Sequence, residues 1–503
     1  MNRRDFLYRS AVLGAVGLLP FPITHTFARP TYKIKLPIPP ILYADEKGNV
    51  ELSILQGETH WDDTRKATTF GINGTILGPT IRVRTNDNVR ITVKNQLKEV
   101  TTLHWHGLLV PGSKDGGPQQ MIQSGESWQT EFRISQPAAT CWYHPHTHQR
   151  TGYQVAMGIG GFLLIDDEVS ITLPLPKEYG VDDIPLVIQD KRLGSDGEID
   201  YKLDAVSASV GWFGNTMLTN GVISPEIVLP KGWVRFRLLN GCNARILVLA
   251  TSDKRPMHVV ASDGGFLSEP VTLDTITLLM GERFEVLVDT RDGKPFDILS
   301  LPTNQIGMSL PPFDKPISVL SCRPLLDEND AKLPETLSLL DEVEVPKNIK
   351  QRNISLTMDH QLHMYGMAEF SRRYGSGGMM NMMGNQSPNQ EQLLTSNSIN
   401  GRAFMLGEPE FDVKRGHYEI WSISGMMTHP FHVHGTQFRI LSENGREPAP
   451  HRRGWKDIVL VNSGESKILV KFDHISHQSH AYMAHCHLLE HEDTGMMLSF
   501  TVS

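Results

Sequence analysis

The chain has 503 residues, several times the size of a usual domain, so we expect more than one hydrophobic core. It is 39% hydrophobic and 21% charged, as globular proteins are, and its net charge of −8 argues against a nucleic-acid binder that relies on a basic surface. Four cysteines are too few for a disulfide scaffold, and no apolar run beyond the N-terminus is long enough for a transmembrane helix or membrane anchor.

The first residues are expected to form an export signal over 1–28. The pair Arg3-Arg4 stands before a mildly apolar stretch, residues 11–21, that ends near Ala28. This arrangement resembles the signal read by the twin-arginine translocation machinery, which exports folded proteins. An ordinary N-terminal helix and a Sec signal are the alternatives. We therefore expect a periplasmic, exported protein that begins soon after Ala28.

Strand patterns dominate the rest of the chain. Apolar and polar side chains alternate over 80–84, 89–93, 233–239, 284–288 and 418–423, and Gly and Pro clusters separate such runs. These features predict an all-β fold built from sandwiches.

A long-period repeat indicates how many sandwiches there are. Asn-Gly pairs, each followed by a series of strand patterns, begin at Asn73, Asn220 and Asn400. The second spacing exceeds the first by about the length of a Met- and Gly-rich stretch, 358–388. Asn-Gly pairs are common in turns, so the repeat alone is a weak signal. With the strand patterns it predicts three Greek-key domains, 30–168, 180–325 and 345–503, with the insert 358–388 in the third.

Eleven of the 21 histidines fall in four short windows, 104–106, 144–148, 429–434 and 485–491. Residues two apart in a strand project from the same face, so the windows place imidazoles in pairs. Neutral imidazole binds copper, zinc and iron, and one metal ion seldom needs more than four protein ligands. Several ions are therefore expected where the first and third domains meet. The pairs are His104 with His106, His144 with His146, His432 with His434, and His485 with His487.

The last window adds a thiol. Cys486 lies between the two members of the last pair, and His491 and Met496 follow it, while His429 lies upstream. Two His, one Cys and a distant Met form the ligand set of a blue-copper electron-transfer site. A buried core thiol and a zinc site are the alternatives, but zinc has no use for a redox-active strand that joins two sites.

These windows resemble the four copper motifs of the multicopper oxidases, a family that includes laccases, ascorbate oxidase and bacterial cuprous oxidases. The resemblance covers essentially the whole mature chain and implies cupredoxin-like domains that bind four copper ions. The motifs are His104-Trp105-His106-Gly107, His144-Pro145-His146-Thr147-His148, His429-Pro430-Phe431-His432-Val433-His434, and His485-Cys486-His487 through Met496.

The resemblance also implies a role for each ligand, with no copper ligand in the second domain and no ligand role for His148. Family members carry two acids near the copper cluster that help to deliver protons, and Asp115 and Glu492 stand at those positions; ordinary turn or solvated carboxylates are the alternative. The implied ligands are His429, Cys486, His491 and axial Met496 for type 1 copper, His104 and His432 for type 2, and His106, His144 and His487 with His146, His434 and His485 for the two type 3 ions.

The electron donor is predicted from the Met-rich stretch. Thioether sulfur favours Cu(I), and similar inserts mark the periplasmic cuprous oxidases, which resemble this chain most closely. Those proteins hold a substrate copper with two Asp and two Met. Here Met358 and Met427 match the methionines, but His363 and Gly425 stand where the acids would be. The candidate substrate-copper ligands are therefore Met358, His363 and Met427.

The resemblance thus implies a monomeric oxidase that serves copper tolerance. It would couple one-electron oxidation of Cu(I), and more slowly of phenols or aromatic amines, to four-electron reduction of dioxygen to water. A general laccase without cuprous specificity is the second reading. A non-catalytic copper-binding protein is the third, and some superfamily members that have lost their ligands serve as cell-division scaffolds. The filled ligand positions of this chain argue against that last role.

Overall fold

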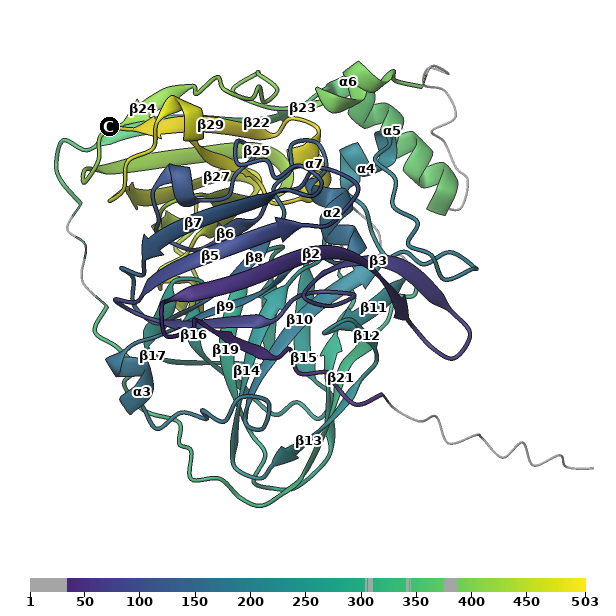
Figure 1. Ribbon diagram of the computed structural model, residues 1–503, viewed down its shortest axis with the longest axis vertical. Helices are drawn as coiled ribbons and strands as arrows, with labels where there is room; N and C mark the ends of the chain where they lie inside the picture. The colour runs from purple at the N-terminus through teal and green to yellow at the C-terminus, as the bar shows by residue number, and fades with distance from the viewer. Residues whose placement is uncertain (1–33, 304, 306–310, 341–342, 344, 375–386) are drawn as a thin grey trace, which may run out of the picture. The chain divides into compact units, whose positions relative to one another are not determined.

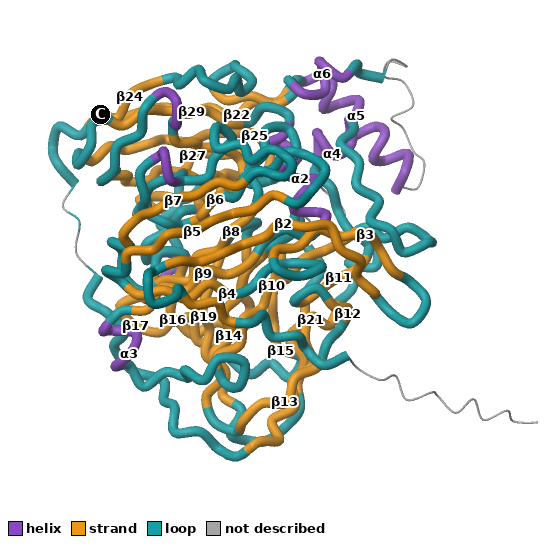
Figure 2. The backbone as a smooth tube through the Cα atoms, viewed as in Figure 1, coloured by secondary structure: helices purple, strands orange, loops and turns teal. Residues whose placement is uncertain are grey.

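The computed structural model describes residues 34–303, 305, 311–340, 343, 345–374 and 387–503. The predicted export signal, 1–28, and the methionines from Met379 to Met383 lie outside these residues. Strands dominate the described chain and form cupredoxin-like sandwiches, so the predicted all-β class is confirmed (Figures 1 and 2). The exact domain limits given above stay a prediction.

The first sandwich has two sheets, with the strand orders β1-β4-β9-β8-β6 and β3-β2-β5-β7. Its core includes Leu52, Ile91, Trp105 and Leu163, which alternate with more exposed residues along strands such as β5. The elements are β1 (Ile41–Tyr43), β2 (Asn49–His60), β3 (Lys66–Ile72), β4 (Thr80–Arg84), β5 (Asn88–Asn95), β6 (His104–His106), η1 (Gly112–Lys114), β7 (Ser127–Arg133), β8 (Ala139–His144), α2 (Thr151–Met157), β9 (Gly161–Asp166) and α3 (Glu168–Thr172).

The second sandwich pairs the sheet β12-β11-β10-β14-β19-β16-β17 with the sheet β13-β21-β20-β15-β18. Its core, around Phe236, Leu249 and Phe284, contains the predicted strands 233–239 and 284–288. The elements are β10 (Asp183–Lys191), α4 (Ala205–Val210), β11 (Thr216–Thr219), β12 (Val222–Ile223), β13 (Glu226–Pro230), β14 (Trp233–Asn240), β15 (Leu247–Thr251), β16 (Met257–Ser262), β17 (Gly265–Leu273), β18 (Thr275–Leu278), β19 (Arg283–Asp289), β20 (Phe296–Ser300) and β21 (Ile317–Leu326).

The third sandwich is built around one long strand, β25. Its first half pairs with β22 and its last residues pair with β28, and the register shifts between Gly425 and Thr428. This bulge lies directly before His429. The elements are β22 (Lys350–Met358), α5 (His360–Tyr374), α6 (Gln390–Leu394), β23 (Asn397–Ile399), β24 (Phe411–Val413), β25 (Tyr418–Val433), β26 (Arg439–Ser442), η2 (Pro450–Arg452), β27 (Ile458–Lys471), η3 (Gln478–His480), β28 (Tyr482–Cys486), α7 (Leu489–Asp493) and β29 (Met497–Val502).

The three Asn-Gly pairs make the same contact in the three sandwiches. Asn73, Asn220 and Asn400 all have positive φ, between 49° and 54°. Each exchanges two hydrogen bonds with the backbone of one strand residue, the amide donating to the carbonyl and the side-chain Oδ1 accepting from the amide. The partners are Ser53 on β2, Val187 on β10 and Ser355 on β22. The repeat in the sequence therefore marks equivalent positions in three similar units.

Most of the described part of the Met-rich stretch is helical. Helix α5 ends at Tyr374, directly before Gly375, and packs on α4 through Leu362 and Ala208 (Figure 1). Gly366 on α5 lies against the Ala205 carbonyl, so that a side chain there would clash. Among the helices in the described ranges, none is both long and apolar enough to cross a membrane.

Candidate metal centre

Sheet register brings the four histidine windows to one place. Strand β6 pairs with β8 so that His104 lies opposite His144, and β25 pairs with β28 so that His432 lies opposite His485. The remaining four histidines of the predicted pairs follow two residues later in each window. All eight are at most 1% exposed, and they come from the first and third sandwiches as predicted.

The two histidine rings of each predicted pair lie close together even where the strand ends between them. Only β6 contains both members of its pair, because β8, β25 and β28 end before His146, His434 and His487. The two rings of each pair nevertheless lie 4.9–6.1 Å apart between centroids. The ligand atoms fall into groups within 4.8 Å of one another: His104 with His106 and His432, His106 with His144 and His487, His146 with His434 and His485, and His429 with Cys486 and His491.

Hydrogen bonds on the outer side of the rings fix where their protons lie. A carbonyl oxygen can only accept, so a ring nitrogen bonded to it carries the hydrogen and the other ring nitrogen keeps a lone pair. Four cluster histidines are held in this way, each with Nε2 left as the acceptor. His104 Nδ1 donates to the Asp115 carbonyl (2.9 Å), His144 Nδ1 to Pro145 (2.8 Å), His432 Nδ1 to Asp457 (2.8 Å) and His485 Nδ1 to Cys486 (3.0 Å).

The resulting lone pairs point at one another. His434 Nδ1 donates to Asp115 Oδ2 at 2.7 Å, so its Nε2 lone pair lies 3.2 Å from that of His485. The buried Nε2 atoms of His104 and His432 have no hydrogen-bond partner within the described part of the chain. Facing lone pairs repel, and a cation between them removes the repulsion. The nitrogens therefore fit a metal ion, and imidazole suits copper, zinc and iron.

Burial keeps these imidazoles uncharged. It is the main cause that lowers the pKa of His485 to about 3, and the neighbouring imidazole of His104 adds to the effect. At neutral pH the ring nitrogens are thus available to a metal without loss of a proton. Burial likewise lowers the pKa well below its usual range at His106, His144, His146, His432, His434 and His487.

A second group surrounds Cys486, the last residue of β28. Its Sγ lies 3.4 Å from His429 Nδ1 and 3.8 Å from His491 Nδ1, and these two nitrogens are 3.3 Å apart. His429 Nε2 donates to the Met426 carbonyl at 2.6 Å, which leaves the Nδ1 lone pair facing the sulfur. Burial raises the pKa of the Cys486 thiol, so the thiolate requires a bound cation to form readily.

Met496 packs beside this group. Its amide donates to the His491 carbonyl at 2.8 Å, and its carbonyl accepts from the Cys486 amide at 3.1 Å. The side chain is fully buried in the core of the third sandwich, together with Cys486. The backbone of Met496 is therefore hydrogen-bonded to two residues of the group, Cys486 and His491. This position suits a residue that supplies a fourth ligand.

The two predicted acids contact the histidine cluster. Asp115 Oδ2 accepts from His434 and lies 3.3 Å from His104 Nδ1. Glu492 on α7 lies 3.4 Å from His146 Nδ1 and 3.2 Å from His485 Nδ1. Burial raises the pKa of Glu492 well above its usual range, and Asp493 adds to this shift. Neither acid is an ordinary solvated carboxylate, since both are almost fully buried.

The candidate substrate-copper residues lie near the Cys486 group. His363 on α5 is close enough to His429 and His491 to add to the lowering of their pKa, for which burial is the larger cause. Met358 is the last residue of β22 and packs against the core of the third sandwich. Met427 lies in the bulge of β25 and has a φ of 66°. His148, for which no ligand role was expected, packs its ring against Phe404 at 5.3 Å.

Several residues at the centre were not found by sequence reasoning. Asp457 Oδ1 lies 3.1 Å from His106 Nε2, and Trp142 stacks on His144 at 4.2 Å. Glu490 accepts from the Trp212 amide at 2.9 Å, and burial raises its pKa to about 7. The sequence could have indicated Glu490 and Asp493, because residues 490–493 place three acids next to the predicted ligand His491. Asp457 gave no local signal, because its partner lies 351 residues away.

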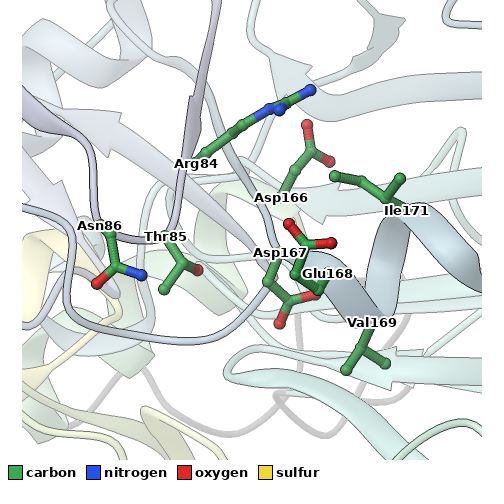
Figure 3. A pocket seen from close by; sticks show the side chains of 8 residues that line it. All are labelled: Arg84, Thr85, Asn86, Asp166, Asp167, Glu168, Val169 and Ile171. Atoms are coloured by element: carbon green, nitrogen blue, oxygen red, sulfur yellow. The ribbon is translucent and has the colours of Figure 1, made fainter.

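A surface pocket of about 250 Å³ lies elsewhere, at the ends of β4 and β9 (Figure 3). Its acids serve the local structure, because Asp166 pairs with Arg82 and Asp167 caps α3. None of its lining residues is a histidine or cysteine, so it is separate from the metal centre. The lining residues are Arg84, Thr85, Asn86, Asp166, Asp167, Glu168, Val169 and Ile171.

Comparison with known proteins identifies the family. Profiles described as "Multicopper oxidase" match residues 54–170, 225–306 and 377–503. The chain belongs to the multicopper oxidase family. Among solved members, the laccase-like multicopper oxidase CueO of a lignin-degrading Ochrobactrum species is 37% identical, with a TM-score of 0.80, and the match covers 93% of this chain and all of that one. A metallo-oxidase from Campylobacter jejuni is 29% identical, with a TM-score of 0.79, over 93% and 95% of the two chains.

Other relatives of this multicopper oxidase carry a different name. The cell division protein FtsP of Xenorhabdus nematophila is 33% identical over 498 residues, which cover 99% of this chain and 97% of that protein. FtsP of Escherichia coli K12 is 34% identical over 505 residues, with coverage of 98% and 97%. Similarity along the whole chain therefore joins this protein both to oxidases and to proteins named for cell division.

Proposed function

We propose that this multicopper oxidase binds four copper ions and couples one-electron oxidation of a donor to reduction of dioxygen to water. The observation that carries the proposal is the position of Cys486. It lies 3.4 Å from His429 in one ligand group, while its chain neighbours His485 and His487 each belong to a group of the histidine cluster. Two adjacent peptide units thus join a thiol-containing group to the histidine cluster, as an electron path requires.

The residues would hold the metals as the family resemblance implies. The Cys486 group with Met496 offers the soft and borderline ligands of a blue-copper site, and the eight cluster imidazoles offer nitrogen to three further ions. When bound, copper would supply the one-electron redox chemistry that lets single-electron donors serve the four-electron reduction of dioxygen. The chain itself supplies uncharged imidazoles, an almost fully buried site and fixed ring orientations.

Reduction of dioxygen to two waters also consumes four protons, which the chain must deliver to a buried place. Asp115 Oδ2 lies 2.7 Å from His434, and Glu492 lies 3.4 Å from His146, so both acids contact the histidine cluster. Their positions support a role as the last carriers of protons before the cluster.

We further propose that Cu(I) is the preferred donor and that phenols and aromatic amines are oxidised more slowly. Met358, His363 and Met427 would hold the incoming ion, since thioethers and imidazole suit Cu(I). The placement of His363 near both imidazoles of the Cys486 group supports this role. The enzyme would act as a monomer after export to the periplasm by the twin-arginine machinery, and would serve copper tolerance there. A general laccase is the alternative.

A role in cell division is the second candidate, because the FtsP relatives align over nearly the whole chain. A protein that served cell division only as a scaffold would not need a thiol and imidazoles whose lone pairs face one another. The arrangement of this chain therefore favours the oxidase.

The donor is tested by comparing two substrates. The double variant Met358→Leu with Met427→Leu should lower kcat/KM for Cu(I) at least tenfold, about 1.4 kcal/mol of transition-state stabilisation, and leave phenol oxidation level. The exposed pair Met121→Leu with Met405→Leu is the matched control and should change neither rate. Equal losses for both donors, or no loss for Cu(I), would leave a general laccase.

A further inference from the structure

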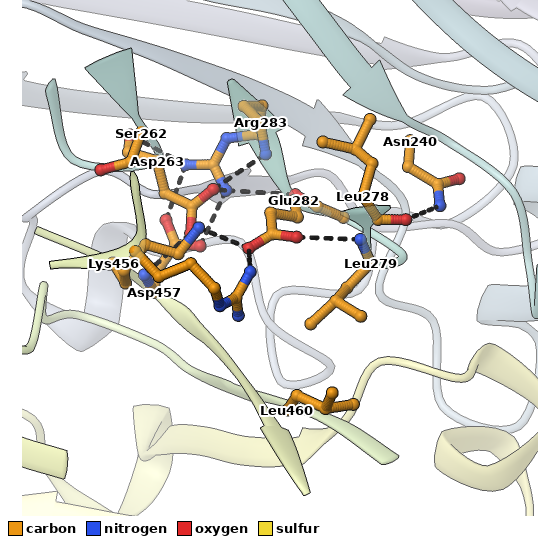
Figure 4. A network of polar contacts seen from close by, with 12 residues as sticks. Asn240, Ser262, Asp263, Leu278, Leu279, Glu282, Arg283, Lys456, Asp457 and Leu460 are labelled. Atoms are coloured by element: carbon orange, nitrogen blue, oxygen red, sulfur yellow. Dashed lines mark hydrogen bonds and ion pairs between the residues drawn. The ribbon is translucent and has the colours of Figure 1, made fainter. Parts of the chain in front are cut away.

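The described residues of the second sandwich supply no side chain to the ligand groups, yet one turn of this sandwich reaches the histidine cluster. The turn joins β18 to β19, and we call Gly281, Glu282 and Arg283, the first residue of β19, the Gly281–Arg283 turn. All three are buried, and Glu282 accepts from the Leu279 amide at 2.9 Å, which closes the turn. Figure 4 shows this turn facing Lys456 and Asp457 of the third sandwich.

Arg283 connects all three sandwiches at this point. Its Nε donates to the Thr140 carbonyl of β8 at 2.9 Å. Its Nη1 and Nη2 donate to the two carboxylate oxygens of Asp457, at 2.7 and 2.6 Å. Lys456 holds the neighbouring acids, with Nζ 2.9 Å from Asp263 and 2.5 Å from Glu282. The two hydrogen bonds from Arg283 fix both the position and the plane of the Asp457 carboxylate.

The Asp457 carboxylate in turn determines the tautomer of His106. Its Oδ1 lies 3.1 Å from His106 Nε2, and a carboxylate accepts, so Nε2 carries the hydrogen. The lone pair is then on Nδ1, which lies 3.3 Å from the Nε2 lone pair of His144. The opposite tautomer would place a lone pair against the carboxylate and a hydrogen toward the metal position.

Gly281 contacts a second cluster imidazole. A Cβ at this residue would lie 2.6 Å from His487 Nε2 and 2.8 Å from its Cε1. The φ of Gly281 is 75°, which is unfavourable for any other residue. Within the described part of the chain, neither ring nitrogen of His487 has a hydrogen-bond partner, so packing alone holds the ring on this side.

We propose that the Gly281–Arg283 turn of the second sandwich positions His106 and His487 for metal binding, Arg283 through Asp457 and Gly281 by leaving room for the imidazole. Both histidines belong to one ligand group with His144. These are positioning residues, and loss of such an outer partner typically lowers metal affinity roughly 10–100-fold. The inference rests on the proposed copper-binding function.

The test measures copper retention against a competing chelator. Copper-loaded wild type, Gly281→Ala and Arg283→Lys are titrated with EDTA, and the copper left per chain is measured together with the blue absorption of the Cys486 site. Both variants should release copper from the histidine cluster at an EDTA concentration at least tenfold lower than wild type. Their blue absorption should persist as in wild type, because within the described residues no hydrogen bond joins the turn to His429, Cys486 or His491.

Two matched variants control for general damage. Gly416→Ala has the same φ of 75° but no atom within 4 Å of the added Cβ. Arg245→Lys disturbs another buried arginine of the second sandwich, whose Nε donates to Asp190 at 2.9 Å and which makes no hydrogen bond to a histidine within the described residues. Both should release copper as wild type does.

Unchanged copper retention in Gly281→Ala and Arg283→Lys would overturn the inference, and so would parallel loss of cluster copper and blue absorption. If Arg283→Lys does not fold, Asp457→Asn gives the same readout, because its amide can donate to His106 and reverse the tautomer. Wild type that binds no copper would instead overturn the proposed function itself.

Discussion

Lys191, the last residue of β10, is fully buried, and within the described residues its side chain makes one hydrogen bond, from Nζ to the Val155 carbonyl at 2.9 Å. It lies at the C-terminal end of α2, while Asp493 accepts from the amides of Thr151 and Gly152 at the other end. Burial lowers the pKa of Lys191 to about 7, although Asp190 partly offsets the shift. We predict that Lys191→Met stabilises the protein at neutral pH.

The magnitude follows from the shift in pKa. The ordinary lysine value is 10.5, so the folded protein holds this proton less tightly by 3.5 pH units, or about 5 kcal/mol. Between pH 7 and 10.5 the unfolded chain binds the extra proton, so wild-type stability rises with pH over this window. The gain from Lys191→Met should be up to about 4 kcal/mol at pH 7, where the folded lysine is half protonated, and about 2 kcal/mol at pH 9. The Val155 carbonyl keeps a partner, because the Gly158 amide also donates to it.

Urea-induced unfolding at pH 7 and pH 9 measures both values. The control Lys94→Met removes a lysine from β5 whose side chain is 42% exposed, and should change stability by about 0.5 kcal/mol or less. A Lys191→Met protein less stable than wild type at pH 7 would refute the reasoning. So would a gain of equal size at the two pH values.

Two further predictions concern the Cys486 site. Cys486→Ser should abolish the blue absorption of the copper–thiolate bond and stop turnover, while copper in the histidine cluster remains, because serine oxygen is a poor substitute for a thiolate; metal analysis with a visible spectrum checks this, and a retained blue band would contradict the type 1 assignment. Met496→Leu should keep the fold at a cost of about 1.5 kcal/mol or less. It should raise the potential of that site, because a weak axial sulfur stabilises Cu(II); an unchanged or lower potential in a redox titration would argue against Met496 as axial ligand.

The sequence predicts those parts of the structure that depend on neighbours in the chain. Alternation over 80–84 predicts β4 with its observed ends, because one face of that strand packs into the core. The histidine pairs are local for the same reason: two residues in one extended segment share a face. The Asn-Gly repeat was also readable from the sequence, because each of these turns needs a residue that tolerates positive φ.

Contacts between distant segments could not be predicted in this way. Asp457 contacts His106 from 351 residues away, and Arg283 reaches Asp457 from the other side of a domain interface. Neither residue stands in a recognisable motif. A charged residue next to a strand is usually solvated, so the sequence gives no sign that these two are buried. The second sandwich was expected to lack copper ligands, and the contribution of its turn to the cluster became visible only in the assembled structure.

Consumption of dioxygen by the copper-loaded protein tests the central claim most directly. An oxygen electrode, with Cu(I) or a phenol as donor and a peroxide assay alongside, gives the electrons taken per dioxygen. The account predicts four electrons per dioxygen, no accumulated peroxide, and no uptake by Cys486→Ser. Fully copper-loaded wild type that consumes no dioxygen with any donor would contradict it and favour the second candidate, a role in cell division.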